Sequence, residues 1–275
     1  MKIRNTTIDL STPHVMGILN VTPDSFSDGG KNSQVDIAVH NALTMVEQGA
    51  TFIDIGGEST RPGASEVMIA EELDRVIPVI QEVRRQSDVY ISIDTSKPEV
   101  MREAVESGAD LINDVRALSL PGAIEEAAKL QVPVCLMHMK GKPRDMQNAP
   151  QYHNVVTEVS EYLSQRVRDC LDAGIHSEHI SLDPGFGFGK SLEHNYELIA
   201  QLEKLHVLGY PLLVGMSRKS MIGQLLERET DQRLIGSVTL AAIAAQKGAQ
   251  IIRVHDVQET VDAVRIVQKV LSLEK

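Results

Sequence analysis

The sequence predicts an α/β protein folded as a single-domain (β/α)8 TIM barrel that spans residues 1–275. Strand-like apolar runs alternate with helical patterns eight times, which is typical of parallel βαβ units. The length of 275 residues is also close to the roughly 250 residues of such barrels. No composition shift, charge block or low-complexity linker marks a second domain. A doubly wound open sheet is the alternative arrangement of the same units.

Eight short apolar runs have the length and composition of buried strands. They cover residues 15–19, 52–55, 90–93, 111–112, 132–137, 179–182, 212–214 and 251–254. Before the first run, residues 2–10 alternate polar and apolar side chains. This alternation predicts an N-terminal hairpin that plugs the bottom of the barrel.

Helical spacing of apolar residues fills the segments between the strands. The predicted helices cover residues 36–47, 70–85, 99–107, 122–130, 155–173, 192–205, 234–247 and 257–271. Gly49 and Gly108 follow helix ends, and Pro98 stands at a first helical position, as helix boundaries favour. Ser220 is expected to open a helix after the seventh strand.

The composition excludes several classes of partner. The formal net charge of −11 and the pI of about 5.3 argue against nucleic acid or an anionic membrane, because both require a basic surface. No run approaches the roughly 18 apolar residues of a membrane span, and the N-terminus lacks a signal-peptide core. A cytoplasmic protein is therefore expected. Cys135 and Cys170 form no metal-binding spacing and are predicted to be buried free thiols.

Short acids and amides are expected directly after four of the strands. These are Asn20, Asp94, Asn113 and Asp183. At the carboxyl ends of barrel strands they would point toward the axis, where unpaired carboxylates are costly. A nitrogen heterocycle rich in N–H groups, such as a pterin edge, fits them, although sugars and metal ions also suit carboxylates. Lys97, at the same rim, is predicted to be solvated or to cap a helix.

Cationic residues gather after strands two, seven and eight. They are Arg61, Lys219, Arg253 and His255. Loops seven and eight are the usual phosphate site of this fold, and the N–H groups of a helix that opens at Ser220 suit an anion. We therefore expect a substrate that carries phosphate. Asn20 and the acids of its loop are candidates to hold Mg²⁺ against that phosphate.

Four apolar side chains lie in the glycine-rich loops of the same rim. They are Phe26, Pro62, Phe186 and Phe188. They are expected either to enclose a flat ring or simply to cap the rim.

Six motifs, in order along nearly the whole chain, resemble bacterial dihydropteroate synthase, close to the gammaproteobacterial type. They are NVTPDSFSDGG at 20–30, DIGGESTRPGA at 54–64, SIDTSKP at 92–98, LDPGFGFGK at 182–190, GMSRKS at 215–220 and RVHD at 253–256. The resemblance implies a transferase with a (β/α)8 barrel, usually a homodimer. Its reaction joins 6-hydroxymethyl-7,8-dihydropterin pyrophosphate to p-aminobenzoate in folate biosynthesis, and sulfonamides compete with p-aminobenzoate.

The resemblance also implies roles for individual residues. Asp94, Asn113, Asp183 and Lys219 would hold the pterin, and Asn20 would contact Mg²⁺. The pyrophosphate would be held by Arg61, Arg253 and His255, with Thr60 beside them. The p-aminobenzoate would be enclosed by Phe26, Pro62, Phe188, Lys219 and Ser220. Asp94, Asp183, Lys219 and Arg253 would act in catalysis.

Two enzyme classes and one binding class compete with this interpretation. A pterin-binding methyltransferase domain shares the barrel and its acids but does not need the phosphate-binding cations. A Schiff-base aldolase would use Lys219 as its nucleophile. A pterin-binding module without activity is the third alternative.

Overall fold

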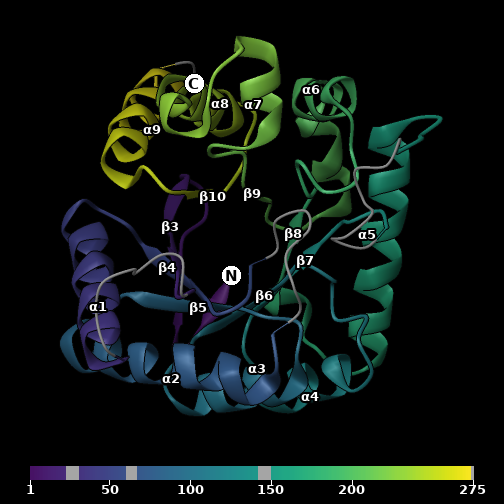
Figure 1. The fold of residues 1–275 in the computed structure, drawn as a ribbon. Helices are drawn as coiled ribbons and strands as arrows, with labels where there is room; N and C mark the ends of the chain where they lie inside the picture. Colours follow the sequence, from purple (N-terminus) through teal and green to yellow (C-terminus); the bar gives the residue numbers. More distant parts are fainter. Residues whose placement is uncertain (23–30, 60–66, 142–149, 274–275) are drawn as a thin grey trace.

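The computed structural model describes residues 1–22, 31–59, 67–141 and 150–273, and its strands form a barrel. Eight parallel strands are ordered β8-β7-β6-β5-β4-β3-β10-β9. A parallel bridge between Leu182 and Leu212 brings the β8 edge back to the β9 edge. Helices surround the strands on the outside (Figure 1). The bridge closes the ring, so the barrel prediction is confirmed and the open doubly wound sheet is excluded.

The strands lie close to the predicted runs: β3 to β6 are one or two residues longer, β8 is shifted by one residue, β7 and β9 are shorter, and β10 is as predicted. The barrel strands are β3 His14–Asn20, β4 Phe52–Gly56, β5 Tyr90–Asp94, β6 Leu111–Asp114, β7 Val134–Met137, β8 Ile180–Asp183, β9 Leu213–Val214 and β10 Ile251–Val254. The extra residues are mostly polar or glycine, which the apolar pattern could not include.

The helices follow the predicted order. They are α1 Lys31–Glu47, α2 Ile69–Gln86, α3 Pro98–Glu106, α4 Ala123–Leu130, α5 Val155–Asp172, α6 Leu192–Ala200, α7 Ser220–Leu226, α8 Leu234–Gln246 and α9 Val257–Leu271. The predicted end of the helix over 192–205 was wrong. It stops at Ala200 and continues as a 3₁₀ segment, Leu202–Leu208, which keeps similar apolar residues buried. The expected start at Ser220 is confirmed.

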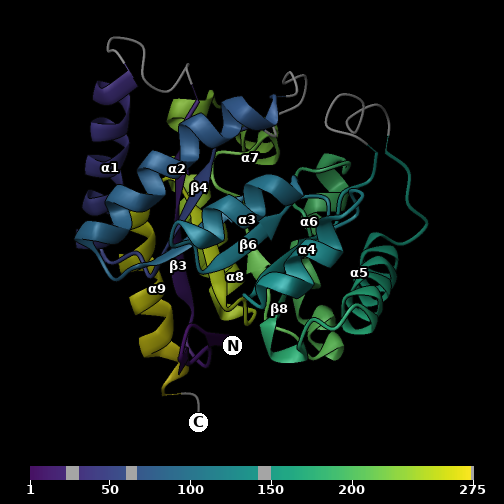
Figure 2. The same ribbon diagram turned by 90° about the horizontal axis from the view of Figure 1, so that it is seen from below.

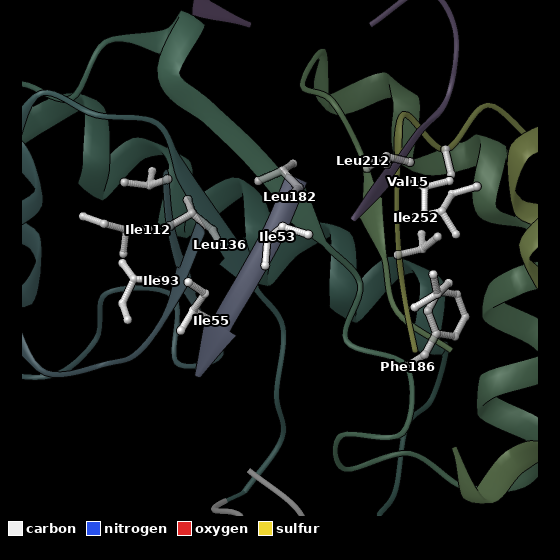
Figure 3. Close-up of a cluster of buried hydrophobic side chains, with 14 of the residues drawn as sticks. Val15, Ile53, Ile55, Ile93, Ile112, Leu136, Leu182, Phe186, Leu212 and Ile252 are labelled. Carbon is white, nitrogen blue, oxygen red and sulfur yellow. The ribbon is translucent and has the colours of Figure 1, made fainter. Parts of the chain in front are cut away.

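Alternate strand residues face outward and form the main core against the helices. Ile53 and Ile55 of β4, Ile93 of β5 and Leu136 of β7 belong to this buried cluster (Figure 3). Because side chains alternate along a strand, the residues between them face the barrel interior. The interior therefore receives the other half of each strand, including Asp54, between Ile53 and Ile55.

A second core cluster fills the bottom of the barrel interior. Met16, Phe52, Leu111, Cys135, Leu213 and Ile251 pack there with Ile3 and Ile8 of the N-terminal segment. That segment forms the antiparallel hairpin of β1 Lys2–Ile3 and β2 Thr6–Thr7. Figure 2 shows the N-terminus toward this lower end of the barrel. The predicted plug is confirmed, and it is apolar on its inner side.

An ion cluster anchors the hairpin to the barrel. Asp110 accepts hydrogen bonds from Arg4 Nε at 2.5 Å, Arg84 Nη2 at 2.6 Å and the Ile91 amide at 2.8 Å. Both oxygens of this buried carboxylate thus accept hydrogen bonds from the protein. Both cysteines are buried and free, as predicted, and no described helix is long and apolar enough to cross a membrane.

Candidate active site at the carboxyl rim

Three of the predicted polar residues lie at the carboxyl ends of neighbouring or nearby strands and are almost fully buried. Asp94 is 7% exposed, Asn113 4% and Asp183 5%. The prediction placed them directly after the strands, and this was wrong by one or two residues. They belong to the strands, because the ladder pairs Asp94 with Asn113 and Met137 with Asp183. Their position inside regular ladders makes their side-chain directions well defined.

Arg253 crosses the barrel interior and joins two carboxylates. Its Nε donates to Asp54 Oδ2 at 2.6 Å and its Nη2 donates to Asp94 Oδ2 at 2.7 Å. Asn113 Nδ2 donates to the same Asp54 oxygen at 3.1 Å. Strand β3 separates β10 from β4 in the sheet, so these bonds span the interior rather than follow the ladder. They confirm that the rim residues converge on the axis.

Burial and charge act against each other in this cluster. Burial raises the pKa of Asp94 to about 7, despite the attraction of Arg253. Burial also raises the pKa of Asp183, against the attraction of Lys219. The pKa of Arg253 is raised because its attraction to Asp54 and Asp94 outweighs the effect of burial. The cluster therefore holds its charges by mutual pairing rather than by water.

Lys219 lies beside Asp183 and contacts the loop after β8. Its Nζ donates to the Phe186 carbonyl at 2.6 Å and lies 4.6 Å from the centre of the Phe188 ring. Burial lowers the pKa of Lys219 to about 8, opposed by the attraction of Asp183. An ammonium with a lowered pKa and an aromatic neighbour suits an aromatic carboxylate.

The end of β10 is also tied to the loop after β9. His255 Nδ1 lies 3.0 Å from Ser217 Oγ, and the His255 amide donates to that oxygen at 3.2 Å. Ser220 is exposed at the first position of α7. The structure therefore brings Lys219, Ser220, Arg253 and His255 to one side of the rim.

Asn20 is the last residue of β3 and is partly buried. Its side chain makes no hydrogen bond with the described part of the chain, so its amide oxygen is available. Four other predicted site residues, Phe26, Thr60, Arg61 and Pro62, lie outside the described residues.

Known proteins match this chain over nearly its full length. The family model described as "Pterin binding enzyme" matches residues 16–255. The dihydropteroate synthase of Escherichia coli K12 is 58% identical, with 99% of this chain and 96% of that protein covered. The chain belongs to the pterin-binding enzyme family.

Two solved dihydropteroate synthases of this family share the fold. The Yersinia pestis enzyme, solved with a sulfonamide drug, has a TM-score of 0.95 and 56% identity, covering 99% of both chains. The Xanthomonas albilineans enzyme, solved with 7,8-dihydropteroate, has a TM-score of 0.88 and 49% identity, covering 96% of this chain and 95% of the other. The resemblance found in the sequence motifs is therefore confirmed, including its closeness to a gammaproteobacterial enzyme.

Sequence reasoning missed Asp54 as a site residue of this pterin-binding chain. Asp54 is fully buried, and its Oδ1 has no hydrogen-bond partner among the described residues. A signal was present, because a carboxylate between Ile53 and Ile55 must face the opposite side of the strand from the helices. Its motif was noted, but Asp54 was not assigned a role.

The structure decides between the two alternatives for Phe186. It does not enclose a ring, because it is fully buried in the main core cluster (Figure 3), whereas Phe188 stays partly exposed beside Lys219. Lys97, expected to be solvated or to cap a helix, stands at the N-cap position of α3, but its side chain makes no cap hydrogen bond and is not solvated. It is 9% exposed and pairs with Glu58 at 2.8 Å and with the fully buried Glu72. The sequence could not reveal this pairing, because its partners come from a different strand end and helix.

Proposed function

We propose that the chain is a dihydropteroate synthase, a transferase of folate biosynthesis. It joins 6-hydroxymethyl-7,8-dihydropterin pyrophosphate to p-aminobenzoate and releases 7,8-dihydropteroate and pyrophosphate. The carbon–oxygen bond to pyrophosphate breaks, and a bond forms between the pterin methylene carbon and the aniline nitrogen, which loses a proton. The observation that carries the proposal is the group of buried Asp94, Asn113 and Asp183 beside the partly buried Arg253, in a chain 58% identical to a named synthase.

The pterin belongs at the carboxylates and the amide. Asp94 and Asp183 are acceptors, and Asn113 supplies both a donor and an acceptor, which matches the mixed edge of a pterin. Buried hydrogen-bonding groups discriminate strongly, because a ligand without the matching groups leaves them unpaired. Asp54 supports this subsite by holding Asn113 Nδ2 and Arg253 Nε on one oxygen.

The pyrophosphate belongs beside Arg253 and His255. Nε and Nη2 of Arg253 hold the carboxylates, whereas Nη1 has no acceptor among the described residues. A guanidinium carries five N–H donors, so it can keep both carboxylates and still donate to a phosphate oxygen. His255 directly follows β10, two residues after Arg253. Arg61 and Thr60 are proposed to complete this subsite.

Catalysis is mainly electrostatic. As pyrophosphate leaves, negative charge grows on its oxygens and Arg253 stabilises it, while positive charge grows on the pterin methylene. Asp94 and Asp183 stabilise that positive charge through the pterin ring. Their places are set before the reaction, so little reorganisation is needed. No side-chain nucleophile is required for this displacement.

The p-aminobenzoate is proposed to lie against Phe188, with Phe26 and Pro62 enclosing it. Its carboxylate would meet Lys219 and the first amide groups of α7 at Ser220. The Xanthomonas albilineans dihydropteroate synthase solved with 4-aminobenzoic acid, 53% identical to this chain, supports a site of this chemistry.

Mg²⁺ is proposed as a cofactor that shares the pyrophosphate with the protein. The described residues contain no group of three or more His, Cys, Asp or Glu side chains that could hold a metal by themselves. They do offer the free amide oxygen of Asn20 at the rim, and Mg²⁺ typically combines one or two protein oxygens with substrate phosphates and waters. Bound there, the ion would neutralise charge on the leaving group.

The test is pyrophosphate release by the purified protein with pterin pyrophosphate and Mg²⁺, with and without p-aminobenzoate. We expect release that depends on p-aminobenzoate, yields dihydropteroate and falls when a sulfonamide is added. Binding of the pterin pyrophosphate without product would instead favour a pterin-binding or methyl-transfer role.

One observation favours a second candidate, a Schiff-base enzyme. The pKa of Lys219 is lowered to about 8, which is what an amine nucleophile needs. Borohydride treatment with a carbonyl substrate would trap adducts on Lys219 in that case. The synthase proposal expects none.

We also propose that the chain forms a homodimer. Helices α7 and α8 expose apolar side chains, with Leu225 54% and Ile235 79% exposed, and such residues favour contact with another surface. Light scattering of wild type and Ile235→Glu tests this, with a loss of mass expected in the variant. The cytoplasmic location stays a prediction, for cell fractionation to test.

A further inference from the structure

Lys190 is a buried lysine to which the proposed reaction assigns no role. It is 2% exposed and follows the loop after β8. Its Nζ donates to the Gly185 carbonyl at 2.8 Å and to the Phe188 carbonyl at 3.2 Å, and lies 2.9 Å from His138 Nδ1. Burial lowers the pKa of Lys190 to about 7, against the attraction of Asp183. In its ammonium form Lys190 has three donors and no acceptor, which match its three neighbours when His138 Nδ1 is the acceptor.

The tautomer of His138 fits this arrangement. Burial and the neighbouring Lys190 lower the pKa of His138 to about 2, so the ring is neutral. The ammonium of Lys190, which can only donate, then selects the tautomer in which Nδ1 carries the lone pair. The ring is held from other sides by Tyr162 and Tyr152, whose ring centres lie 5.0 Å and 6.2 Å away. His138, directly after β7, therefore has a well-held ring. Lys190 connects this ring to the loop after β8 by hydrogen bonds.

The loop that Lys190 ties has little room to move elsewhere. Gly185 has a φ of +70°, and a Cβ built on it would lie 1.8 Å from the His138 carbonyl oxygen. The Phe188 amide donates to the Gly185 carbonyl at 3.1 Å, and the Gly185 amide donates to Asp183 Oδ1 at 2.7 Å. Lys190 thus binds the two carbonyls that begin and end a tight turn directly after Asp183.

That turn carries the contacts of Lys219. Its Phe186 carbonyl accepts from Lys219 Nζ at 2.6 Å, and its Phe188 ring lies 4.6 Å from the same atom. We propose that Lys190 is a positioning residue for the synthase reaction, because it holds the turn after β8 in place. The turn then orients Lys219 through the Phe186 carbonyl and presents the Phe188 ring face to p-aminobenzoate. This role rests on the proposed function, because it names the substrate that Lys219 and Phe188 meet.

The test compares Lys190→Met with Lys129→Met, whose parent side chain is 72% exposed on α4. In the folded Lys190→Met enzyme we expect the KM for p-aminobenzoate to rise about tenfold, since the turn loses more than one hydrogen bond. We also expect acetylation of Lys219, measured by mass spectrometry, to become about fivefold faster as its carbonyl partner moves away. Lys129→Met is expected to behave as wild type in both measurements.

A second pair of variants covers the case in which Lys190→Met does not fold. His138→Asn keeps an acceptor oxygen where the ring has Nδ1, whereas His138→Leu removes it, and both lose the ring contacts. We expect His138→Leu to shift both readouts in the same direction as Lys190→Met, and His138→Asn to lie closer to wild type.

The outcomes separate the two proposals. A folded Lys190→Met with wild-type KM for p-aminobenzoate and wild-type Lys219 reactivity overturns the positioning role, as does equal behaviour of the two His138 variants. If wild type makes no dihydropteroate, the synthase proposal fails. The Lys219 acetylation rates then still decide whether Lys190 positions that side chain.

Discussion

Replacing Asp54 with asparagine tests the residue that the structure added to the site. Asp54 Oδ2 accepts from Arg253 Nε and Asn113 Nδ2, and Oδ1 has no partner among the described residues. An asparagine can place its oxygen at the Oδ2 position and keep both bonds. Its amide nitrogen then replaces Oδ1 and is a buried donor without an acceptor.

The magnitude follows from these two changes. An unsatisfied buried donor costs about 1–3 kcal/mol, and loss of the charge on the Arg253 partner removes about 1 kcal/mol more. For a chain of this size we expect Tm to fall by about 8 °C. We expect kcat/KM for pterin pyrophosphate to fall about 100-fold, because the bond that fixes the Arg253 fork beside the leaving group weakens when its acceptor loses its charge.

Asp110→Asn provides the matched control. Asp110 is also a buried carboxylate bound by arginines, but it lies at the bottom of the barrel with the N-terminal hairpin. Its variant should lose a similar amount of Tm and keep wild-type kcat/KM. Wild-type kcat/KM in Asp54→Asn would refute the role of Asp54. A loss of kcat/KM in Asp110→Asn as large as in Asp54→Asn would show that general destabilisation explains both.

Three further predictions concern the rim. Asp94→Asn should abolish most turnover and keep the far-UV circular dichroism of wild type, because it removes charge facing the developing cation; full turnover would contradict that role. The pH profile of kcat/KM should rise as Asp94 ionises near pH 7 and fall as Lys219 deprotonates near pH 8, and Lys219→Arg should move the alkaline limb upward if that assignment is right. Gly185→Ala should lower Tm by about 5 °C and reduce kcat/KM, because its Cβ meets the His138 carbonyl. The control, Gly174→Ala, has a φ of +93° and no atom within 4 Å of the added Cβ, so it should lose stability only. Equal activity in the two variants would contradict a role of the turn after β8 in the reaction.

The fold could be predicted from the sequence because its signals are local. Each strand is a short apolar run, and each helix has its own periodicity and boundary residues, such as Pro98 at the start of α3. The order of such elements then leaves few topologies. What local signals could not give was where α6 changes to 3₁₀ geometry, since the apolar spacing of 202–205 satisfies both helices.

The site could be predicted only as a set of residues at one rim. Asp94, Asn113 and Asp183 were found because strand ends share an edge, and the structure brings them together. Their pairing partners were not predictable in the same way. Which carboxylate meets Arg253 depends on the register of β10 against β3 and of β3 against β4, and no local pattern encodes both registers.

The two ends of the barrel use the same chemistry for different purposes. At the bottom, both oxygens of Asp110 accept from Arg4, Arg84 or a backbone amide, so this buried carboxylate has no unpartnered oxygen. At the rim, Asp54 keeps one buried oxygen without a partner, and Arg253 keeps Nη1 without an acceptor, among the described residues. Leaving buried polar groups unpaired costs stability, which a fold tolerates where a ligand supplies the missing partners. The unused donors and acceptors therefore distinguish the rim from the bottom, and they point to a substrate that brings N–H groups and phosphate oxygens together.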